Sequence, residues 1–251
     1  RFFHYFCLMD TKEEIIRQFE AQTAPLSPET HEKLANILVR FNLAKGDHFL
    51  REGEVCKYYS MVARGMIRLF YNKDGRDLTE HFSYEKGIFV SLESYFRQTP
   101  SYLMIEALEP TVIYSFPHDQ LQDLMRTNHE VEHMYCKMLE NSLIESQQKA
   151  DACRFETARE RYHRLATEHP EVVKRAPLIH IASRLGMTPE TLSRVRAGLL
   201  KQFLHPGKRL THPFPTIPAT HENNRPDILV QRESHPHPGK PPTERDPEHV
   251  A

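Results

Sequence analysis

Short, glycine-punctuated segments between residues 38 and 116 constrain the fold of this 251-residue chain more than any other feature. Runs rich in β-branched and aromatic residues occur at 49–50, 58–62, 66–71, 77–82, 102–108 and 111–116. Turn sequences such as Lys45-Gly46-Asp47, Arg64-Gly65 and Lys86-Gly87 separate them. Strands this short, with a turn about every ten residues, indicate an antiparallel barrel or sandwich rather than alternating β/α units. The Asp74-Gly75 step between two of the runs predicts a tight hairpin.

Helical signals stand on both sides of the strand-rich segment. Ile15, Ile16 and Phe19 fall at helical spacing between residues 9 and 22. Ser27-Pro28-Glu29 then provides a cap and a first-turn proline for a second helix, through residue 37. After the strands, Pro117 is expected to open a further short helix. Another helix is expected from about residue 156 to about His169, with Arg159, Arg161 and Arg164 exposed.

A long helix is predicted from its expected cap, Asn128, to about Cys153. Its apolar positions are Val131, Met134, Tyr135, Met138, Leu139, Leu143 and Ile144. The stripe is wide in the first half of the helix and becomes polar after Ile144. Two interpretations fit this pattern equally well: a helix lying on the barrel, or a dimer seam whose first half also covers the barrel.

The charge is distributed unevenly along the chain. Residues 1–153 carry 17 basic and 23 acidic side chains, a net of −6, whereas residues 154–200 carry 9 and 5, a net of +4. The whole chain, at −1, is too nearly neutral for a basic nucleic-acid coat or an acidic disordered protein. An acidic body followed by a short basic segment is typical of a sensor joined to a nucleic-acid reader.

Neither the cysteines nor the histidines form a metal-binding or catalytic pattern. The four cysteines are far apart and include no CxxC pair: Cys7, Cys56, Cys136 and Cys153. A cupin-type enzyme needs a His-x-His pair on its strands, but the one such pair here, His235 and His237, falls in the tail. No catalytic triad or glycine-rich phosphate loop stands out. We therefore predict no enzyme activity, no metal and no cofactor, and scattered thiols suit a reducing cytoplasm.

Both ends of the chain are expected to lie outside the fold. The apolar run at residues 2–9 is too short to cross a bilayer and lacks a cleavage site, so we predict no membrane association. Residues 1–8 are interpreted as leader or added sequence before a natural start at Met9. Ten of the 18 prolines fall in residues 201–251, which predicts a disordered Pro/His-rich tail.

Residues 178–200 carry the most specific signal in the chain. Five apolar residues stand where two steeply crossing helices must touch: Ile181, Ala182, Leu185, Leu192 and Val195. Gly186 stands where the first helix ends and tolerates a left-handed conformation. Thr188-Pro189-Glu190 then restarts a helix with a cap, a first-turn proline and a carboxylate at the positive end of the helix dipole. This pattern predicts a helix-turn-helix, whose second helix enters the DNA major groove.

The outward residues of that second helix are the candidates for DNA contact. They are Glu190, Thr191, Ser193, Arg194 and Ala197, flanked by Arg184 and Arg196. Arginine reads guanine through two hydrogen bonds, and glutamate accepts one from the cytosine amino group. Arg184, Arg196 and Arg159 are expected to contact phosphates. The alternative is an ordinary helical hairpin with a charged surface, but the agreement of small residue, glycine, cap and apolar spacing favours DNA binding.

The order of these parts resembles the Crp/Fnr superfamily of bacterial transcription regulators, from about residue 15 to residue 200. The similarity is greatest to the Bacteroidetes-type subgroup, in Leu50-Arg51-Glu52-Gly53-Glu54-Val55-Cys56 and in residues 181–194. The resemblance implies an α+β fold with an N-terminal antiparallel β-roll like a cyclic-nucleotide-binding jelly roll (9–127), a dimerisation helix (128–153) and a winged helix-turn-helix (154–200). It also implies a homodimer that reads an inverted repeat in double-stranded DNA, with RNA polymerase as a further partner. Base contacts would come from Glu190 and Arg194, with Thr188 and Ser193 nearby.

The chain departs from the family pattern at the effector site. Members that bind cyclic AMP carry a Gly-Glu pair and then an arginine followed by a small residue. Residues 89–93 here read Phe-Val-Ser-Leu-Glu and residues 100–102 read Pro-Ser-Tyr, while Arg97 falls earlier in the loop. Glu93 is the remaining candidate for a ribose contact, although a lone glutamate in a loop is usually only solvated. We expect no cyclic AMP binding, and Cys7 alone cannot hold an iron–sulfur cluster, so the effector stays unassigned.

A second departure follows the recognition helix. The superfamily usually continues with a β-hairpin wing, but residues 203–218 are too interrupted by proline to predict one. The alternative function for the whole chain is a β-roll that senses a ligand or binds a protein without any role for DNA. The helix-turn-helix pattern weighs against this alternative.

Overall fold

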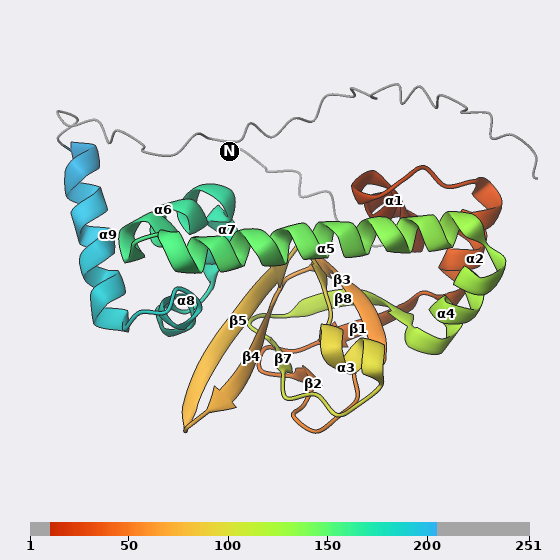
Figure 1. Cartoon of the computed structure of the whole chain (residues 1–251), viewed down its shortest axis with the longest axis horizontal. Coiled ribbons are helices and arrows are strands. Elements are labelled where there is room, and N and C mark those ends of the chain that lie inside the picture. Colours follow the sequence, from red (N-terminus) through yellow and green to blue (C-terminus); the bar gives the residue numbers. More distant parts are fainter. Residues whose placement is uncertain (1–10, 205–251) are drawn as a thin grey trace, which may run out of the picture. The chain divides into compact units, whose positions relative to one another are not determined.

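Antiparallel strands form two four-stranded sheets in the computed structural model, which describes residues 11–204 (Figure 1). The strands are β1 (Val39–Leu43), β2 (His48–Leu50), β3 (Tyr58–Arg64), β4 (Met66–Lys73), β5 (Arg76–Tyr84), β6 (Ile88–Phe89), β7 (Met104–Ala107) and β8 (Thr111–Pro117). One sheet has the order β1-β8-β3-β6 and the other β2-β7-β4-β5. The predicted antiparallel sandwich is therefore confirmed, although β1 and β6 lie outside the predicted runs.

The β4–β5 hairpin forms where the sequence predicts it. Asp74 and Gly75 both have positive φ angles, +52° and +74°, and Lys73 pairs with Arg76 directly across the turn. Two successive left-handed residues match the right-handed twist of the flanking strands. The register shifts opposite Leu69 and Phe70, so a bulge interrupts β5 at its middle.

The helices include two that the sequence analysis does not predict. In chain order they are α1 (Lys12–Gln22), α2 (Pro28–Ile37), α3 (Leu92–Arg97), α4 (His118–Thr127), α5 (His129–Phe155), α6 (Ala158–Glu168), α7 (Pro170–Arg175), α8 (Leu178–Arg184) and α9 (Pro189–Leu204). The unpredicted ones, α3 and α7, have six residues each, too few to show an apolar periodicity. No helix between residues 11 and 204 is long and apolar enough to cross a membrane.

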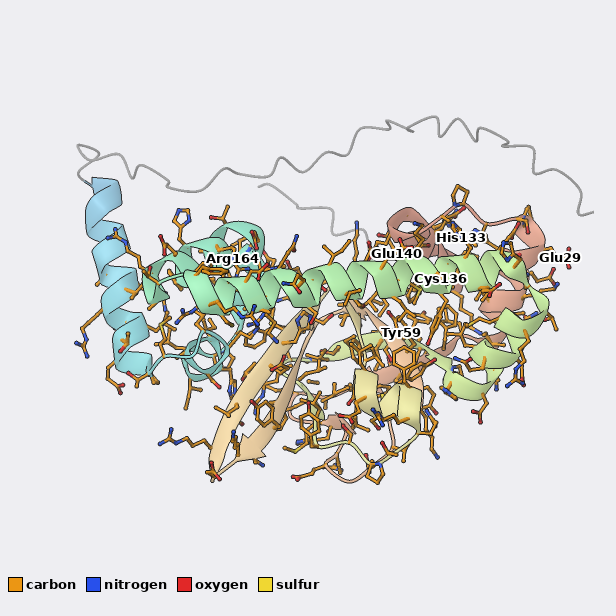
Figure 2. The ribbon with its side chains drawn as sticks, in the orientation of Figure 1. Glu29, Tyr59, His133, Cys136, Glu140 and Arg164 are labelled. Carbon is orange, nitrogen blue, oxygen red and sulfur yellow. The ribbon has the colours of Figure 1, made fainter. Side chains whose placement is uncertain are left out.

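The long helix α5 has two different halves. Its first turns cover the sandwich, because Val131, Met134, Tyr135 and Met138 are buried in the same core as the strands. The opposite side of these turns faces solvent, where His133, Cys136 and Glu140 lie along the helix (Figure 2). Further along, Leu143 and Ile144 are 72% and 56% exposed. The first half therefore lies on the sandwich, as both interpretations predict, and the apolar surface of the second half has no partner within the described residues.

A glycine at the β3–β4 turn should be indispensable for folding. Gly65 has a φ of +95°, and a Cβ there would stand 2.7 Å from both the Pro110 carbonyl oxygen and the Thr111 Cα. We expect Gly65→Ala to lower the free energy of unfolding by about 3 kcal/mol or more, since backbone strain and overpacking add. Gly53→Ala is the control, because Gly53 also has a positive φ (+85°) but open space around it. Urea unfolding measures both, and equal losses would contradict the role of the close contact.

Candidate nucleic-acid interface

The turn between α8 and α9 is closed by its own backbone and by one threonine. Gly186 has a φ of +65°, and its N–H donates to the Ser183 carbonyl at 3.0 Å. The N–H of Met187 reaches back to the Ala182 carbonyl, also at 3.0 Å. Thr188 then caps α9, since its Oγ1 accepts from the N–H of Thr191 at 3.2 Å. The roles that the sequence predicts for Gly186 and Thr188 are both present.

The two helices touch through the predicted apolar residues. Four of these residues are buried in one cluster (Ile181, Ala182, Leu185 and Leu192), and Val195 packs against it. Tyr162 of α6 and Val172 of α7 complete the same cluster. Leu192 is fully buried, so the side of α9 that carries it faces α8. The opposite side of α9 is thereby left facing outward.

That outward side carries most of the predicted DNA-contacting residues. Five are exposed along α9 and its cap: Thr188, Glu190, Ser193, Arg194 and Arg196. Ala197 is exposed with them, and Thr191 is half-buried. The pKa of Glu190 lies below its usual range, because its own backbone N–H and then the Thr188 hydroxyl donate to the carboxylate. The face therefore combines a carboxylate acceptor with two guanidinium donors near the first turns of one helix.

Three other arginines lie differently from the prediction. Arg184 is predicted as an outward flank but is half-buried, and burial lowers its pKa even though Glu80 of β5 lies nearby. Arg161 donates to the carbonyls of Leu185 (3.0 Å) and Glu156 (2.7 Å), so it supports the turn instead of standing exposed. Arg164 on α6, labelled in Figure 2, is half-buried and pairs with Glu156 at 2.9 Å. Only Arg159 of the predicted trio on α6 is exposed.

Buried serines form hydrogen bonds within the connection between β6 and β7, the stretch that corresponds to the cyclic AMP site of the family members that bind it. The hydroxyls of Ser91 and Ser101 lie 2.9 Å apart, and that of Ser101 also accepts from the N–H of Leu103 at 3.0 Å. Ser94 accepts from the N–H of Cys56 at 2.9 Å and donates to the Thr99 carbonyl at 2.6 Å. The hydroxyls of this connection are thus already hydrogen-bonded within the chain.

The connection itself contains one basic side chain. Arg97 is the single arginine or lysine between residues 91 and 103. Arg97 is the last residue of helix α3, whereas the sequence analysis places it in a loop. Its side chain is 71% exposed, and its Nε lies 3.5 Å from the Glu93 carboxylate. Glu93 is itself 62% exposed, as a solvated glutamate would be. In the described part of the chain, no three His, Cys, Asp or Glu side chains are grouped to hold a metal ion.

Sequence reasoning missed the contacts that join this interface to the sandwich. The Ser183 hydroxyl accepts from the N–H of Thr79 at 2.9 Å and donates to the Asp77 carbonyl at 3.1 Å. His180 accepts a hydrogen bond from Arg68 at 3.0 Å. The partners in these contacts lie more than 100 residues apart in the sequence, so no local sequence pattern predicts the contacts. The prediction of a disordered tail from residue 201 is wrong for residues 201–204, which form the last turn of α9, because the first proline after residue 200 is Pro206. The predictions for residues 1–8 and for the wing and the tail beyond residue 204 fall outside the described residues.

Comparisons with known proteins agree with this geometry. Residues 40–128 match the cyclic nucleotide-binding domain family. FixK2 from Bradyrhizobium japonicum is 22% identical with a TM-score of 0.55, over 66% of this chain and 86% of its own. The c-di-GMP-responsive global regulator CLP from Xanthomonas campestris is 16% identical with a TM-score of 0.55, over 71% of this chain and 94% of its own. A regulatory protein from Silicibacter pomeroyi is 20% identical with a TM-score of 0.55, over 76% of this chain and 88% of its own.

No curated protein matches the chain by sequence. At these identities the solved structures establish the fold, and the domain match covers the sandwich and helix α4. The structural likeness to FixK2 and to CLP extends over 66% and 71% of this chain. Residues 40–128 therefore belong to the cyclic nucleotide-binding domain family, and the chain has the fold of the Crp/Fnr transcription regulators.

Proposed function

We propose that the protein is a sequence-specific DNA-binding transcription regulator that acts as a homodimer on an inverted repeat. The outward face of α9 carries this proposal. Leu192 packs α9 onto α8, and the cap at Thr188 sets where the helix begins. Glu190 and Arg194 consequently stand exposed on the first turns, where a recognition helix reaches base edges in the major groove.

The exposed residues divide into two roles. Arg194 and Glu190 read bases, because a guanidinium matches guanine and a carboxylate accepts from cytosine. Arg196 and the hydroxyls of Thr188 and Ser193 contact the backbone and hold the register. Arg184 has no role in this proposal, since its side chain is half-buried and lies near Glu80 of β5. Phosphate contacts of this kind make affinity fall steeply with salt.

The second half of α5 supports the homodimer. Leu143 and Ile144 are adjacent, exposed aliphatic residues on a helix whose first half is already packed on the sandwich. A second copy of the same helix would remove both from water, as in the Crp/Fnr fold that the chain shares. The dimer would then set the distance between two recognition helices.

The sandwich is proposed to sense something other than cyclic AMP. The hydroxyls of Ser91, Ser94 and Ser101 are bonded within the chain, and Arg97 lies outside the connection between β6 and β7. A cyclic phosphate would enter a site without a guanidinium partner, where its charge would be poorly compensated. No catalytic role is proposed for any residue.

Selection of genomic DNA fragments by the full-length protein, sequenced at two salt concentrations, tests the proposed function. We expect one inverted repeat with half-site centres about one helical turn, roughly 10 base pairs, apart. Recovery of random fragments alone at both salts would favour a ligand-sensing or protein-binding sandwich without a DNA role.

Two arginines on α9 should respond differently to truncation. Arg194→Ala should weaken binding to the selected repeat by about 1–3 kcal/mol and relax the preference at one base pair. Arg196→Ala should weaken selected and random DNA alike and reduce the salt slope by about one. Fluorescence anisotropy on both DNAs measures these effects, and uniform losses in both variants would refute base reading by Arg194.

A charge on the second half of α5 should separate the dimer. Leu143→Glu places a carboxylate on the proposed seam, so the sedimenting mass should fall to that of one chain. Ile179→Glu on α8 is the control, because Ile179 is similarly exposed (60%) but lies outside α5. If Leu143→Glu sedimented like the wild type, the dimer would have to form elsewhere.

Cyclic AMP should leave the thermal unfolding midpoint unchanged. A ligand present at about a hundred times its Kd would add about 2.7 kcal/mol of stability and raise the midpoint by several degrees. Differential scanning calorimetry with saturating cyclic AMP, and in parallel with cyclic di-GMP, gives the comparison. A rise with cyclic AMP would contradict the closed serine network.

A further inference from the structure

The outer face of the β2-β7-β4-β5 sheet is covered by the helix-turn-helix. Met66 of β4 and Phe82 of β5 are buried in one cluster with Ile181, Ala182 and Leu185. The same cluster contains Leu192, so α9 shares it as well. The sheet and the DNA-contacting helices are therefore packed around a common core within the described residues.

A buried arginine stands beside that core. The Arg68 side chain is 5% exposed, and its guanidinium donates to both carboxylate oxygens of Asp77, at 2.6 and 2.7 Å. Its Nε donates to Glu106 at 2.9 Å, and the guanidinium carbon lies 3.8 Å from the centre of the Phe70 ring. Its Nη1 also donates to Nδ1 of His180 on α8. Arg68 thus joins three strands to the first helix of the helix-turn-helix.

The open edge of the sheet is held by a serine of the same helix. β5 is an edge strand, so some of its backbone groups have no partner strand. Ser183 of α8 provides hydrogen-bond partners for two of these groups, because its hydroxyl accepts from the N–H of Thr79 and donates to the Asp77 carbonyl. The hydroxyl of one α8 residue thus replaces a missing neighbour strand at two adjacent positions of β5.

Contacts from other helices continue along β5. The guanidinium of Arg175 on α7 donates to Glu85 at 2.7 Å and also contacts Glu109. His169 lies 3.1 Å from the Tyr84 hydroxyl, and Lys149 of α5 pairs with Glu80. Polar contacts therefore run from Glu80 in the middle of β5 to Glu85, just beyond its end, and join this stretch to α5, to α7 and to the residue between α6 and α7.

Strand β4 faces both cores at once. Ile67 and Leu69 are buried in the core between the two sheets, whereas Met66 lies in the cluster shared with α8. Because neighbouring residues of a strand point to opposite faces, a shift of β4 moves both sets together. A change inside the sandwich would reach α8 along this strand.

We propose that Arg68 and Ser183 are positioning residues for DNA reading, which hold α8 on β4 and β5 and thereby set the spacing of the two recognition helices. The proposal rests on the proposed function. Each recognition helix is then placed by its own sandwich as well as by α5. The preferred distance between DNA half-sites consequently depends on this docking.

The test uses variants on α8 that remove a docking contact without emptying a core. Ser183→Ala deletes the hydroxyl, and Ser183→Thr restores one. His180→Phe removes the acceptor for Arg68 but keeps a ring. Ser146→Ala, at an exposed position on α5, is the matched control.

Amide hydrogen exchange in the full chain without DNA reports on the docking itself. Ser183→Ala should speed exchange at Thr79 and in α8 on the order of tenfold, because a lost hydrogen bond shifts local opening by about that factor. Exchange at Met61 and Ile113, deep in the sandwich, should stay unchanged. Ser183→Thr should restore protection, and Ser146→Ala should resemble the wild type. Unchanged exchange at Thr79 and in α8 would overturn the proposal.

Half-site spacing separates positioning from a general loss of stability. The wild type should prefer the selected repeat over repeats with one base pair inserted or removed. Ser183→Ala and His180→Phe should lose that discrimination on the order of tenfold, while affinity for the best repeat changes less. If Ser183→Ala and His180→Phe lost the same affinity for repeats of every spacing, the contacts would have only a structural role, and the proposed positioning would be overturned. If the wild type selects no sequence, the proposed function fails, the positioning of a DNA reader is overturned with it, and exchange still reports whether α8 docks.

Acidification provides a second check on the His180 contact. Burial and then Arg68 lower the pKa of His180, against the opposing charges of Asp77 and Glu106. The folded pKa thus lies below the unfolded value of 6.5, so the contribution to docking is complete above 6.5 and decreases as the pH falls through the folded pKa. Protection of α8, corrected for intrinsic exchange, should therefore decrease on acidification in the wild type. His180→Phe should lose the part of this dependence that His180 causes, and an identical dependence in both proteins would count against the contact.

Discussion

Burial of the Arg68 charge is the constraint on which the arrangement of the C-terminal helices depends. A guanidinium on the outer face of a sheet stays out of water only if its donors are matched. Asp77 and Glu106 supply that match from the neighbouring strands, and Phe70 lies under the guanidinium plane. His180 accepts a further hydrogen bond and so joins α8 to this group. The fold thus uses one charge to join the sandwich to the helix-turn-helix.

The same docking explains why α9 has an inner and an outer face. Leu192 is buried in the same cluster as Met66 and Phe82, so the residues on the other side of α9 face solvent. The DNA-reading surface proposed on α9 needs no cavity and no buried polar group. It needs a rigid helix with exposed donors and acceptors, and the packing beneath α9 provides that rigidity.

Local signals in the sequence were sufficient wherever a single turn decides the backbone. Asp74-Gly75 predicts the β4–β5 hairpin because both residues tolerate positive φ angles, which the structure confirms. Gly186 and Thr188 predict the end of one helix and the start of the next for equally local reasons. Helices α3 and α7 were not predicted, since six residues are too few to show an apolar period.

The orientation of a long charged side chain follows different rules. Arg184 and Arg194 both belong to the helix-turn-helix and look alike in the sequence, yet Arg184 is half-buried near Glu80 of β5 and Arg194 is exposed. The sequence by itself determined the antiparallel sandwich, the long helix and the turn of the helix-turn-helix, because periodicity, caps and glycines act over a few residues. Only the tertiary structure decided which charges meet, since Arg68 and His180 lie 112 residues apart and contact depends on how whole elements pack.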